Sequence, residues 1–420
     1  MKRLILLLAG GLLLATMSAN AGVIAIRDAR VITVGRDGTL ARATVLIRNG
    51  RIEALGADLE IPAGAKIVEG AGRVLTPGLI VARSTLGQRE IDEVDETDDV
   101  TSGQPRYSAA LDVVDGLNPR SVLLPVSRID GITRSLVAPD AGKGGSLIAG
   151  QGAIISLAGS LVPPEQFVVR PRAAMFAALG ERGHAIAGSR LAALAALREA
   201  FEEAKGGGLR LSGGLSGNAQ LSPLDLAALR PVLAGETPLV LSVDRASDIL
   251  AALRLADDYG LQLVISGGAE AHLVAGELAS RQVPVLLDPS LDLPARFELL
   301  HARPDAADLL ARAGVRFAFI DSSDNASNLR QLAGIAVSHG LSRDLALAAI
   351  TLQPAEILGL AGVLGSIEPG KIADLVLWDG DPLEVTTAAT EVWIEGQAMP
   401  MISRQTLLRD RYRPKPQATP

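Results

Sequence analysis

The middle of the chain alternates short β-rich runs with longer helical runs, and this alternation restricts the fold more than any other feature of the sequence. The strand-like runs cover residues 238–243, 261–266, 283–288 and 315–321. Runs rich in alanine and leucine follow three of them, at 246–260, 270–282 and 328–340. This recurrence predicts βαβ units around a parallel sheet, which either closes into a barrel or stays open as a doubly wound sheet.

Both ends of the chain have a different, strand-and-turn character. Residues 23–56 alternate apolar and polar side chains between the turn signals Arg-Asp-Gly (36–38) and Arg-Asn-Gly (48–50), a pattern typical of short antiparallel strands. Residues 365–382 and 390–399 have the same character. Since a few short strands need partners, we expect the two ends to form one composite β-domain that encloses the middle of the chain.

The first 21 residues resemble a secretory signal peptide. Lys2 and Arg3 precede the apolar run from Leu4 to Ala15, and Ala19-Asn20-Ala21 offers small residues for cleavage. The apolar run is shorter than the roughly 20 residues that a membrane span requires. We therefore expect a mature chain from Gly22, exported to a bacterial periplasm and without a membrane span; an uncleaved anchor is the alternative.

Composition excludes several classes of function. The chain has no cysteine, which rules out disulfides, thiolate nucleophiles and cysteine metal sites. A formal net charge of −7 provides no basic surface for nucleic acid. With 420 residues and 48% hydrophobic content, the chain can bury one large core. Two segments depart from the alternation: the acidic run from Glu90 to Asp99, expected as a solvated loop, and the glycine-rich run from Gly142 to Gly152, expected as a flexible loop at the top of a barrel.

Four motifs resemble the amidohydrolase superfamily, in particular its imidazolonepropionase-related members. They are residues 29–56, residues 72–80 (GRVLTPGLI), residues 351–360 (TLQPAEILGL) and residues 365–384 (GSIEPGKIADLVLWDGDPLE). The resemblance implies an α/β fold, a (β/α)8 TIM-like barrel with a β-sandwich built from both ends of the chain. The expected domains are listed by range: signal peptide 1–21, β-sandwich 22–75 and 360–403, barrel 76–359, C-terminal tail 404–420.

The resemblance also implies a metal site at the carboxyl ends of the barrel strands, which activates water for hydrolysis. The family places two histidines one residue apart after strand one, a lysine or glutamate on strand four, histidines on strands five and six, and an aspartate on strand eight. At the first two positions this chain has Arg83 and Thr85, and at strand five it has Ser242. Arg83 is a cation without a lone pair to donate. We expect no binuclear site, and either no metal or a single weakly bound divalent ion such as zinc.

The remaining candidates are few. Asp321 ends the strand-like run 315–321 near the position of the family's proton-shuttling aspartate, with Asp324 as competitor; alternatively, Asp321 caps the following helix. Strand six ends at Ser266, and His272 follows inside the next helix. His184, His301 and His339 belong to helix ends or loops and are expected at the surface.

Two functions fit these residues. The first is a hydrolase of C–N bonds in small amides, cyclic amides or dipeptide-like molecules, with Asp321 as general base and Arg83 as an electrostatic clamp. Its substrate-binding candidates are Arg83, Thr85, Ser242, Arg245 and His272. The second is a catalytically inactive periplasmic protein that binds a small anionic molecule or a partner through Arg83, Ser242, Arg245 and the acidic run. In a variant of this hypothesis, Arg83 pairs internally with an acid from Glu90 to Asp99 or with Asp321. The sequence leaves the oligomeric state open, although barrels of this family commonly pair, which makes a homodimer one candidate assembly.

Overall fold

The computed structural model describes residues 22–91, 94–102, 107–142, 145–159, 166–206, 221–291, 293–321, 323 and 325–413. The predicted signal peptide and Asp324 lie outside the described residues. Within these ranges, no helix combines the length and the hydrophobicity that crossing a membrane would require.

An eight-stranded sheet occupies the middle of the chain and confirms the predicted α/β barrel class. Its strands are β6 (Leu79–Ser84), β7 (Ile132–Val137), β8 (Ile148–Ser156), β9 (Val168–Ala178), β10 (Leu239–Val243), β11 (Leu263–Gly267), β12 (Val285–Leu287) and β13 (Phe317–Phe319). They are hydrogen-bonded in chain order from β6 to β13. The four runs that the alternation singled out became β10, β11, β12 and β13, each within a few residues of its expected range.

The two ends of this sheet are joined by a short segment rather than by a direct ladder. The Phe319 N–H of β13 donates to the Ala349 carbonyl at 3.0 Å, and the Ile80 N–H of β6 donates to the Ile350 carbonyl at 2.9 Å. Ala349 and Ile350 are fully buried. The pair of carbonyls thus bridges β13 and β6 and completes the ring of strands.

One strand interrupts the regular βα alternation. β8 pairs antiparallel with both β7 and β9, while the other neighbouring strands of this sheet run parallel. The expectation of a flexible loop at 142–152 is wrong for residues 148–152, which belong to β8 and are buried. The glycines there serve close packing, because a Cβ at Gly152 would lie 2.5 Å from the Phe176 ring.

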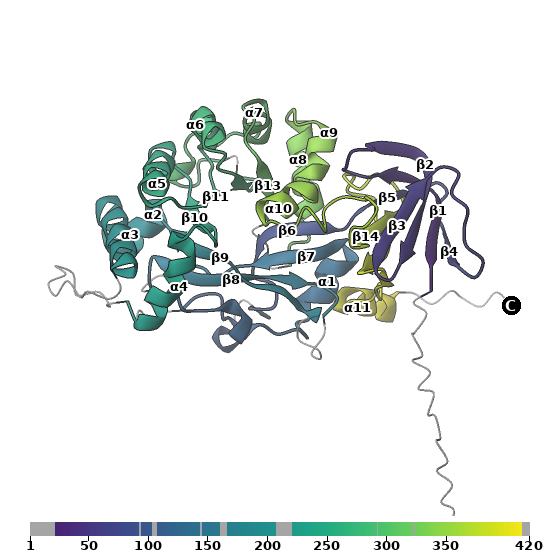
Figure 1. Cartoon of the computed structure of the whole chain (residues 1–420), viewed down its shortest axis with the longest axis horizontal. Coiled ribbons are helices and arrows are strands. Elements are labelled where there is room, and N and C mark those ends of the chain that lie inside the picture. The colour runs from purple at the N-terminus through teal and green to yellow at the C-terminus, as the bar shows by residue number, and fades with distance from the viewer. Residues whose placement is uncertain are drawn as a thin grey trace, which may run out of the picture.

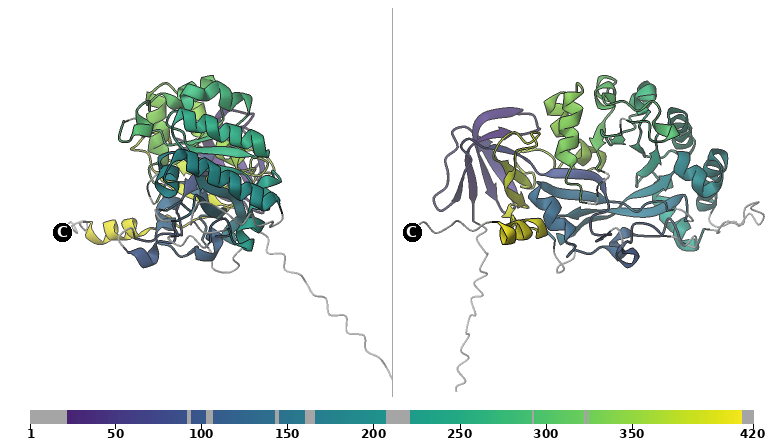
Figure 2. Two further views of the ribbon diagram at one scale, coloured as in Figure 1. Left: turned by 90° about the vertical axis from the view of Figure 1, so that its left-hand side faces the viewer. Right: turned by 180° about the vertical axis from the view of Figure 1, so that it is seen from behind.

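A second sheet combines both ends of the chain, as the composite β-domain predicts. Its strands are β1 (Ile24–Ile32), β2 (Thr39–Arg48), β3 (Arg51–Gly56), β4 (Lys66–Glu69), β5 (Val74–Pro77), β14 (Leu375–Trp378), β15 (Ala389–Ile394) and β16 (Gln397–Ala398). The N-terminal and C-terminal strands meet where β5 pairs antiparallel with β14. Figures 1 and 2 show this domain at one end of the molecule, beside the barrel.

A buried ion pair joins the two sheets. Arg134 on β7 is 1% exposed and donates to both carboxylate oxygens of Asp374, at 2.6 and 3.2 Å, and to Glu395 at 3.0 Å. Asp374 also accepts the Glu395 N–H at 2.8 Å, and its own carbonyl accepts the Gly78 N–H. This cluster fixes the chain where it passes from the β-domain into the barrel.

Helices lie outside the strands, and apart from the last one, which has no buried residue, they bury residues against the rest of the protein. They are α1 (Leu123–Ile129), α2 (Gly180–Ala187), α3 (Arg190–Lys205), α4 (Pro223–Leu233), α5 (Ala246–Tyr259), α6 (Ala275–Ser280), α7 (Ala306–Arg312), α8 (Leu329–Ser338), α9 (Arg343–Ala348), α10 (Leu352–Ile357) and α11 (Arg404–Tyr412). Short 3-10 turns add η1 (Asp95–Thr97), η2 (Val113–Gly116), η4 (Ala271–Val274) and η5 (Phe297–Leu299). Figure 1 shows α3, α5, α6, α7 and α8 following one another along one side of the strands.

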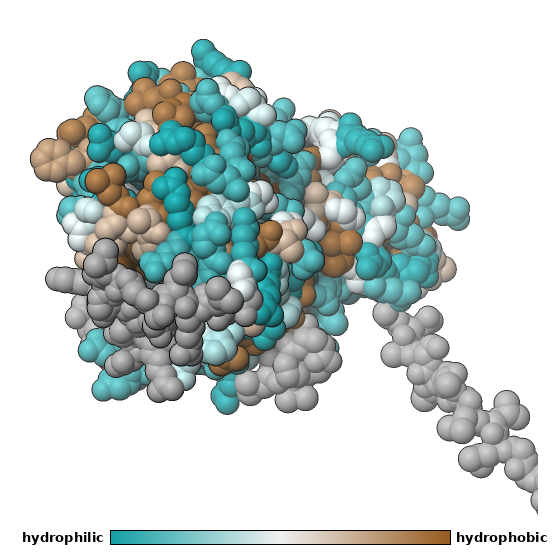
Figure 3. Space-filling model, turned by 60° about the vertical axis from the view of Figure 1, so that its left-hand side comes forward, coloured by the Kyte–Doolittle hydropathy of each residue, from teal (hydrophilic) through white to brown (hydrophobic). Residues whose placement is uncertain are grey.

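The surface and the interior are clearly separated. Alternate strand residues divide into an inner cluster, which includes Ile80, Val240 and Val264, and an outer cluster that packs on the helices. Hydrophilic residues cover much of the face in Figure 3, with hydrophobic groups set among them. The described part of the acidic run 90–99 is largely exposed, as expected. The tail begins with α11, none of whose residues is buried.

Candidate functional site

The side chain of Arg83, at the end of β6, lies against the ends of two strands on the other side of the barrel. Its Nη1 donates to the Ser242 hydroxyl of β10 at 3.3 Å and to the Ser266 hydroxyl of β11 at 3.1 Å. Ser242 and Ser266 are direct neighbours in the register of β10 and β11. The three side chains therefore form one polar group, here called the Arg83 centre, at the carboxyl ends of these strands.

Local backbone geometry brings these groups together. Ser242 and Ser266 follow Val240 and Val264 by two residues, and since both valines belong to the inner cluster, strand alternation turns the serines inward. Arg83 would by the same rule share the outer side with Leu79 and Val81. However, the pairing of β6 with β7 is irregular between Val81 and Ser84, and an irregularity of this kind re-aims a side chain.

Asp140, in the loop after β7, is the counter-ion of Arg83. Its Oδ1 lies 3.2 Å from Nη2 of Arg83 and also pairs with Arg182 of α2. The expected alternatives, an acid from the described part of 90–99 or Asp321, do not pair with Arg83. β7 is the hydrogen-bonded neighbour of β6, so an acid after β7 reaches the guanidinium. In the run 90–99, Asp98 instead bonds to Arg89 and Glu90 bonds to residues 118–122.

Charge compensation at this centre is incomplete. One carboxylate serves two arginines, and the Arg83 side chain is 21% exposed. Burial lowers the pKa of Arg83, Asp140 raises it and the neighbouring Arg182 lowers it further. The Phe176 ring lies 6.0 Å from the guanidinium carbon, at the limit of a cation–π contact. The Arg83 centre is thus an electropositive point at the barrel mouth.

These residues do not fit a divalent metal. The guanidinium occupies the space between the strand ends and repels a cation, and two hydroxyls are weak neutral ligands. Strand β9 ends in Ala177 and Ala178, which have no donor atom. Among the described residues, no group of three or more histidine or carboxylate side chains could hold a metal ion.

Asp321 is buried and bonded to its own turn. Its Oδ1 accepts the Ser323 N–H at 2.9 Å and its Oδ2 accepts the Asn328 N–H at 2.7 Å. Asn328 directly precedes α8, so the carboxylate holds the start of this helix. Each oxygen keeps a second lone pair, but Asp321 makes no hydrogen bond or ion pair with the Arg83 centre.

The other predicted site residues are spread around the mouth. Thr85 follows β6, is half-buried, and its hydroxyl makes no hydrogen bond among the described residues. His272 lies in η4, where its Nδ1 is buried without a partner and burial lowers its pKa. Arg245 is exposed at the start of α5. The structure therefore joins Arg83 and Ser242 by a hydrogen bond. Among the described residues, no hydrogen bond or ion pair joins them to Thr85, Arg245, His272 or Asp321. His184, His301 and His339 are exposed, as expected.

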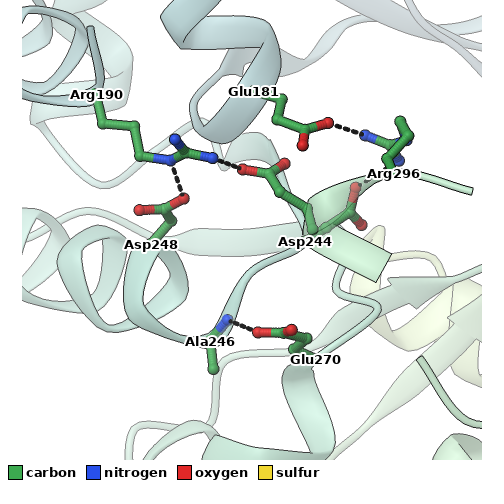
Figure 4. Close-up of polar contacts among 8 residues, drawn as sticks. Glu181, Arg190, Asp244, Ala246, Asp248, Glu270 and Arg296 are labelled. Atoms are coloured by element: carbon green, nitrogen blue, oxygen red, sulfur yellow. Dashed lines mark hydrogen bonds and ion pairs between the residues drawn. The ribbon is translucent and has the colours of Figure 1, made fainter. Parts of the chain in front are cut away.

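A cleft of about 620 Å³ opens beside the Arg83 centre, beyond the ends of β9 to β12. Arg190 in its wall donates to Asp248 at 2.9 Å and to Glu298 at 2.6 Å. Arg296 joins the two regions, since it pairs with Glu181 at 3.4 Å and with Asp244, two residues after Ser242, at 2.9 Å. Figure 4 shows these contacts and the bond from the Ala246 N–H to Glu270.

Sequence reasoning missed several of these residues. Ser266 was seen as the end of strand six but not as a site residue, although it holds the position equivalent to Ser242 on the next strand. Asp140 had a signal, an acid just after the strand-like run 132–137. Glu270, Glu298 and Arg190 had none, because only the tertiary fold brings them to one cleft.

The described geometry can be compared with known proteins. A family model described as "Amidohydrolase family" matches residues 286–402. "Amidohydrolase tasK" of Hapsidospora irregularis is 26% identical over 84% of this chain and 39% of its own length. The imidazolonepropionase of Mesorhizobium japonicum is 32% identical over 34% of this chain and 35% of its own length. The chain thus spans less than half the length of these curated relatives.

One solved structure is much more similar overall. The crystal structure of an amidohydrolase from Thermotoga maritima MSB8 superposes with a TM-score of 0.80 and 27% sequence identity. The match covers 89% of this chain and 99% of that one. Barrel and β-domain therefore both have counterparts in a single relative of the same extent.

Proposed function

The chain belongs to the amidohydrolase superfamily, and from this premise we propose that it hydrolyses C–N bonds of a small molecule at the Arg83 centre. The substrate classes are small amides, cyclic amides and dipeptide-like molecules. The proposal differs from the superfamily's usual chemistry in one respect: the electropositive group at the strand ends is an arginine side chain.

The observation that carries the proposal is the position of the Arg83 guanidinium. It is held between the β10 and β11 strand ends by Ser242 and Ser266, at 3.3 and 3.1 Å, and its ion-pair partner, Asp140, also pairs with Arg182. Barrel enzymes gather their working groups at this face. A preorganised cation there stabilises negative charge that develops on a carbonyl oxygen.

In the proposed reaction, Arg83 binds the scissile carbonyl and stabilises the oxyanion formed when water attacks the carbonyl carbon. Asp321 accepts the proton of the attacking water as general base. The proton then passes to the leaving nitrogen as the C–N bond breaks, which restores the carboxylate. The two backbone N–H groups that bond to Asp321 support this role, because they fix the orientation of its carboxylate.

The residues also determine what we propose about cofactors. Superfamily enzymes typically depend on a divalent metal such as zinc, which would supply an activated water. The positive charge of Arg83 opposes such an ion, so we propose no binuclear site and either no metal or a single weakly bound zinc ion. None of the steps above requires one.

Location and partners follow from the sequence. We propose that residues 1–21 direct export and that the mature protein acts in the periplasm on a small molecule. The net charge of −7 argues against nucleic acid as a partner. A homodimer is the proposed assembly, by analogy with related barrels.

A second candidate is a binding protein without catalysis, and one observation favours it. Arg83 already has a counter-ion in Asp140 and two hydroxyl partners, while both Asp321 oxygens are engaged by backbone. In this case the ion pair replaces the charge of a lost metal, and the barrel binds a small anionic ligand without turning it over.

Metal analysis of the purified protein, followed by hydrolysis assays on dipeptides and cyclic amides with and without zinc or manganese, separates these possibilities. We expect turnover that survives a chelator and falls about 10²–10³-fold in Arg83→Met. The matched control, Arg254→Gln on the exposed side of α5, should retain activity. Turnover that stops with chelator and returns with zinc would overturn the metal-free reaction written above and leave the single zinc ion, and absence of turnover on the whole panel would contradict the hydrolase and favour the binding protein.

A further inference from the structure

The cleft beside the Arg83 centre is a separate concave site. Neither Arg83, Ser242 nor Asp321 lines it. Its volume of about 620 Å³ lies within the range of small-molecule sites, roughly 300–1,000 Å³. Its walls come from α2, α3, the start of α5, the loop after β11 and η5, which all follow strands β9 to β12.

Several charges in the cleft walls are already balanced. Glu298 is 3% exposed and receives Arg190 at 2.6 Å. A Cβ at Gly180 would lie 2.8 Å from both Glu298 oxygens, so the glycine leaves room for this carboxylate. Glu181 has Arg296 at 3.4 Å. These pairs shape the cleft but leave little charge for a ligand.

Two opposite charges in the same cleft remain unpaired. The exposed Arg245 side chain makes no hydrogen bond or ion pair among the described residues. Glu270 is only 5% exposed, and its Oε2 accepts the Ala246 N–H at 2.9 Å while its Oε1 has no partner among the same residues. Because Glu270 lines the cleft and only one of its carboxylate oxygens accepts a hydrogen bond among the described residues, the other oxygen is suited to receive a donor from a ligand.

Arg245 and Glu270 lie close together without neutralising each other. Glu270 binds the N–H of Ala246, the residue directly after Arg245, yet no nitrogen of Arg245 comes within ion-pair distance of its carboxylate. Figure 4 shows Glu270 beside Ala246, joined to it by the hydrogen bond. A molecule with a cation and an anion a few ångströms apart would satisfy both side chains at once.

The cleft also has an apolar part. Phe297 is 83% exposed and Leu300 is 55% exposed, and both line it. An exposed aromatic ring and a leucine beside an otherwise charged cleft offer contact to an apolar side chain of a ligand.

We propose that this cleft binds the zwitterionic head of an amino acid, with the carboxylate on Arg245, the ammonium on Glu270 and an apolar side chain against Phe297 and Leu300. The site is distinct from the Arg83 centre and needs no catalytic step. Arg296 links the two regions, since it pairs with Glu181 of the cleft and with Asp244, two residues after Ser242.

The test is isothermal titration calorimetry of the full chain with three probes that share one phenyl group. L-phenylalanine has both charges, 2-phenylethylamine only the cation and 3-phenylpropionate only the anion. We expect L-phenylalanine to bind about 10- to 100-fold more tightly than either of the others, since each lost charge removes a charge-assisted hydrogen bond.

Variants assign each charge to its partner. Arg245→Gln should weaken L-phenylalanine binding about tenfold or more and leave 2-phenylethylamine unchanged. Glu270→Gln, whose amide oxygen can still accept the Ala246 N–H, should weaken the two amines and leave 3-phenylpropionate unchanged. Arg254→Gln, an equal charge loss on α5 outside the cleft, should bind like the wild type.

Equal affinity for all three probes, no binding of any, or equal loss in Arg254→Gln would overturn the proposal. Should Glu270→Gln not fold, the exposed Arg245 still decides the result. The outcome is independent of the proposed hydrolysis: Arg83→Met should lose turnover but keep L-phenylalanine affinity, so failure of one proposal leaves the other readable.

Discussion

Two arginines on neighbouring strands, Arg134 on β7 and Arg83 on β6, show opposite treatments of a cation inside one protein. Arg134 is 1% exposed and is bound by both oxygens of Asp374 and by Glu395. Burial alone would lower its pKa, but Asp374 and Glu395 raise it. Arg83 pairs with one carboxylate, which it shares with Arg182, and donates to two hydroxyls. Burial is the main cause of its lowered pKa.

The difference separates a structural charge from an available one. At the junction of the two sheets, Nε and Nη2 of Arg134 both donate to carboxylates. The cation therefore stabilises the contact between the two domains and is not available to a ligand. At the barrel mouth, Arg83 and Arg182 share the carboxylate of Asp140. A ligand can therefore supply a further acceptor to Arg83. Incomplete compensation is therefore a better sign of a binding site than burial.

The largest effect is expected where compensation is complete. Asp374→Asn leaves the buried Arg134 with only the partly exposed Glu395, and breaking a buried pair in this way costs about 3–5 kcal/mol. Urea unfolding should show this loss. Arg42→Met, which removes an exposed partner of Asp28, serves as the surface control and should leave the midpoint nearly unchanged; an equally small effect of Asp374→Asn would contradict the structural role.

A smaller loss is expected for Asp140→Asn, which removes the acid shared by Arg83 and Arg182. Both cations lose their counter-ion, but the site is partly solvated, so we expect about 1–3 kcal/mol. The double variant with Arg83→Met should recover part of it, because no half-buried cation then remains. Strict additivity of the two changes in unfolding free energy would show that Asp140 does not act on Arg83.

The third arginine cluster, in the cleft, provides a pH test. Burial raises the pKa of Glu298, although the Glu181 backbone and Arg190 oppose this shift. A folded pKa above the unfolded value means that stability from this group is present below the ordinary glutamate pKa and is lost as pH rises through the raised value. As pH rises above the ordinary glutamate pKa, Glu298→Gln should therefore gain stability relative to wild type. Glu199→Gln on exposed α3 should show no such trend.

The smallest effect on stability is expected for Arg83→Met alone. Asp140 keeps Arg182 as a partner, and the removed guanidinium was poorly compensated, so the free energy of unfolding should change by less than about 1 kcal/mol. Loss of function with unchanged stability would distinguish Arg83 most clearly from Arg134. A loss as large as that of Asp374→Asn would make the two arginines equivalent.

The sequence was informative where local pattern and fold agree. The helical run 246–260 became α5 (Ala246–Tyr259) and 328–340 became α8 (Leu329–Ser338), since their apolar faces and chain breaks are local features. The run 270–282 became η4 and α6 instead of one helix. β8 was missed because its glycines resemble a loop, and only the neighbouring Phe176 and Val137 show why they are needed.

For the site, sequence could place strand ends but not the contacts across them. Arg83 and Ser242 were expected at one mouth because strands ending at the same barrel face converge. Asp140 is the counter-ion because β7 is the strand that pairs with β6. The orientation of Asp321 is set by hydrogen bonds from its own turn. Which charged side chains meet in a cleft depends on the tertiary fold, and a local sequence pattern does not show it.

The closure of the barrel through Ala349 and Ile350 has a consequence for how the protein is made. A ribosome delivers the strands from β6 to β13 before the two carbonyls that join their ends, and β14, the partner of β5, later still. The nascent chain must therefore keep an unclosed ring and an incomplete N-terminal sheet until almost all of it has been translated. Export before folding, as proposed above, would suit such a chain, because neither the barrel nor the β-domain can be completed early in translation.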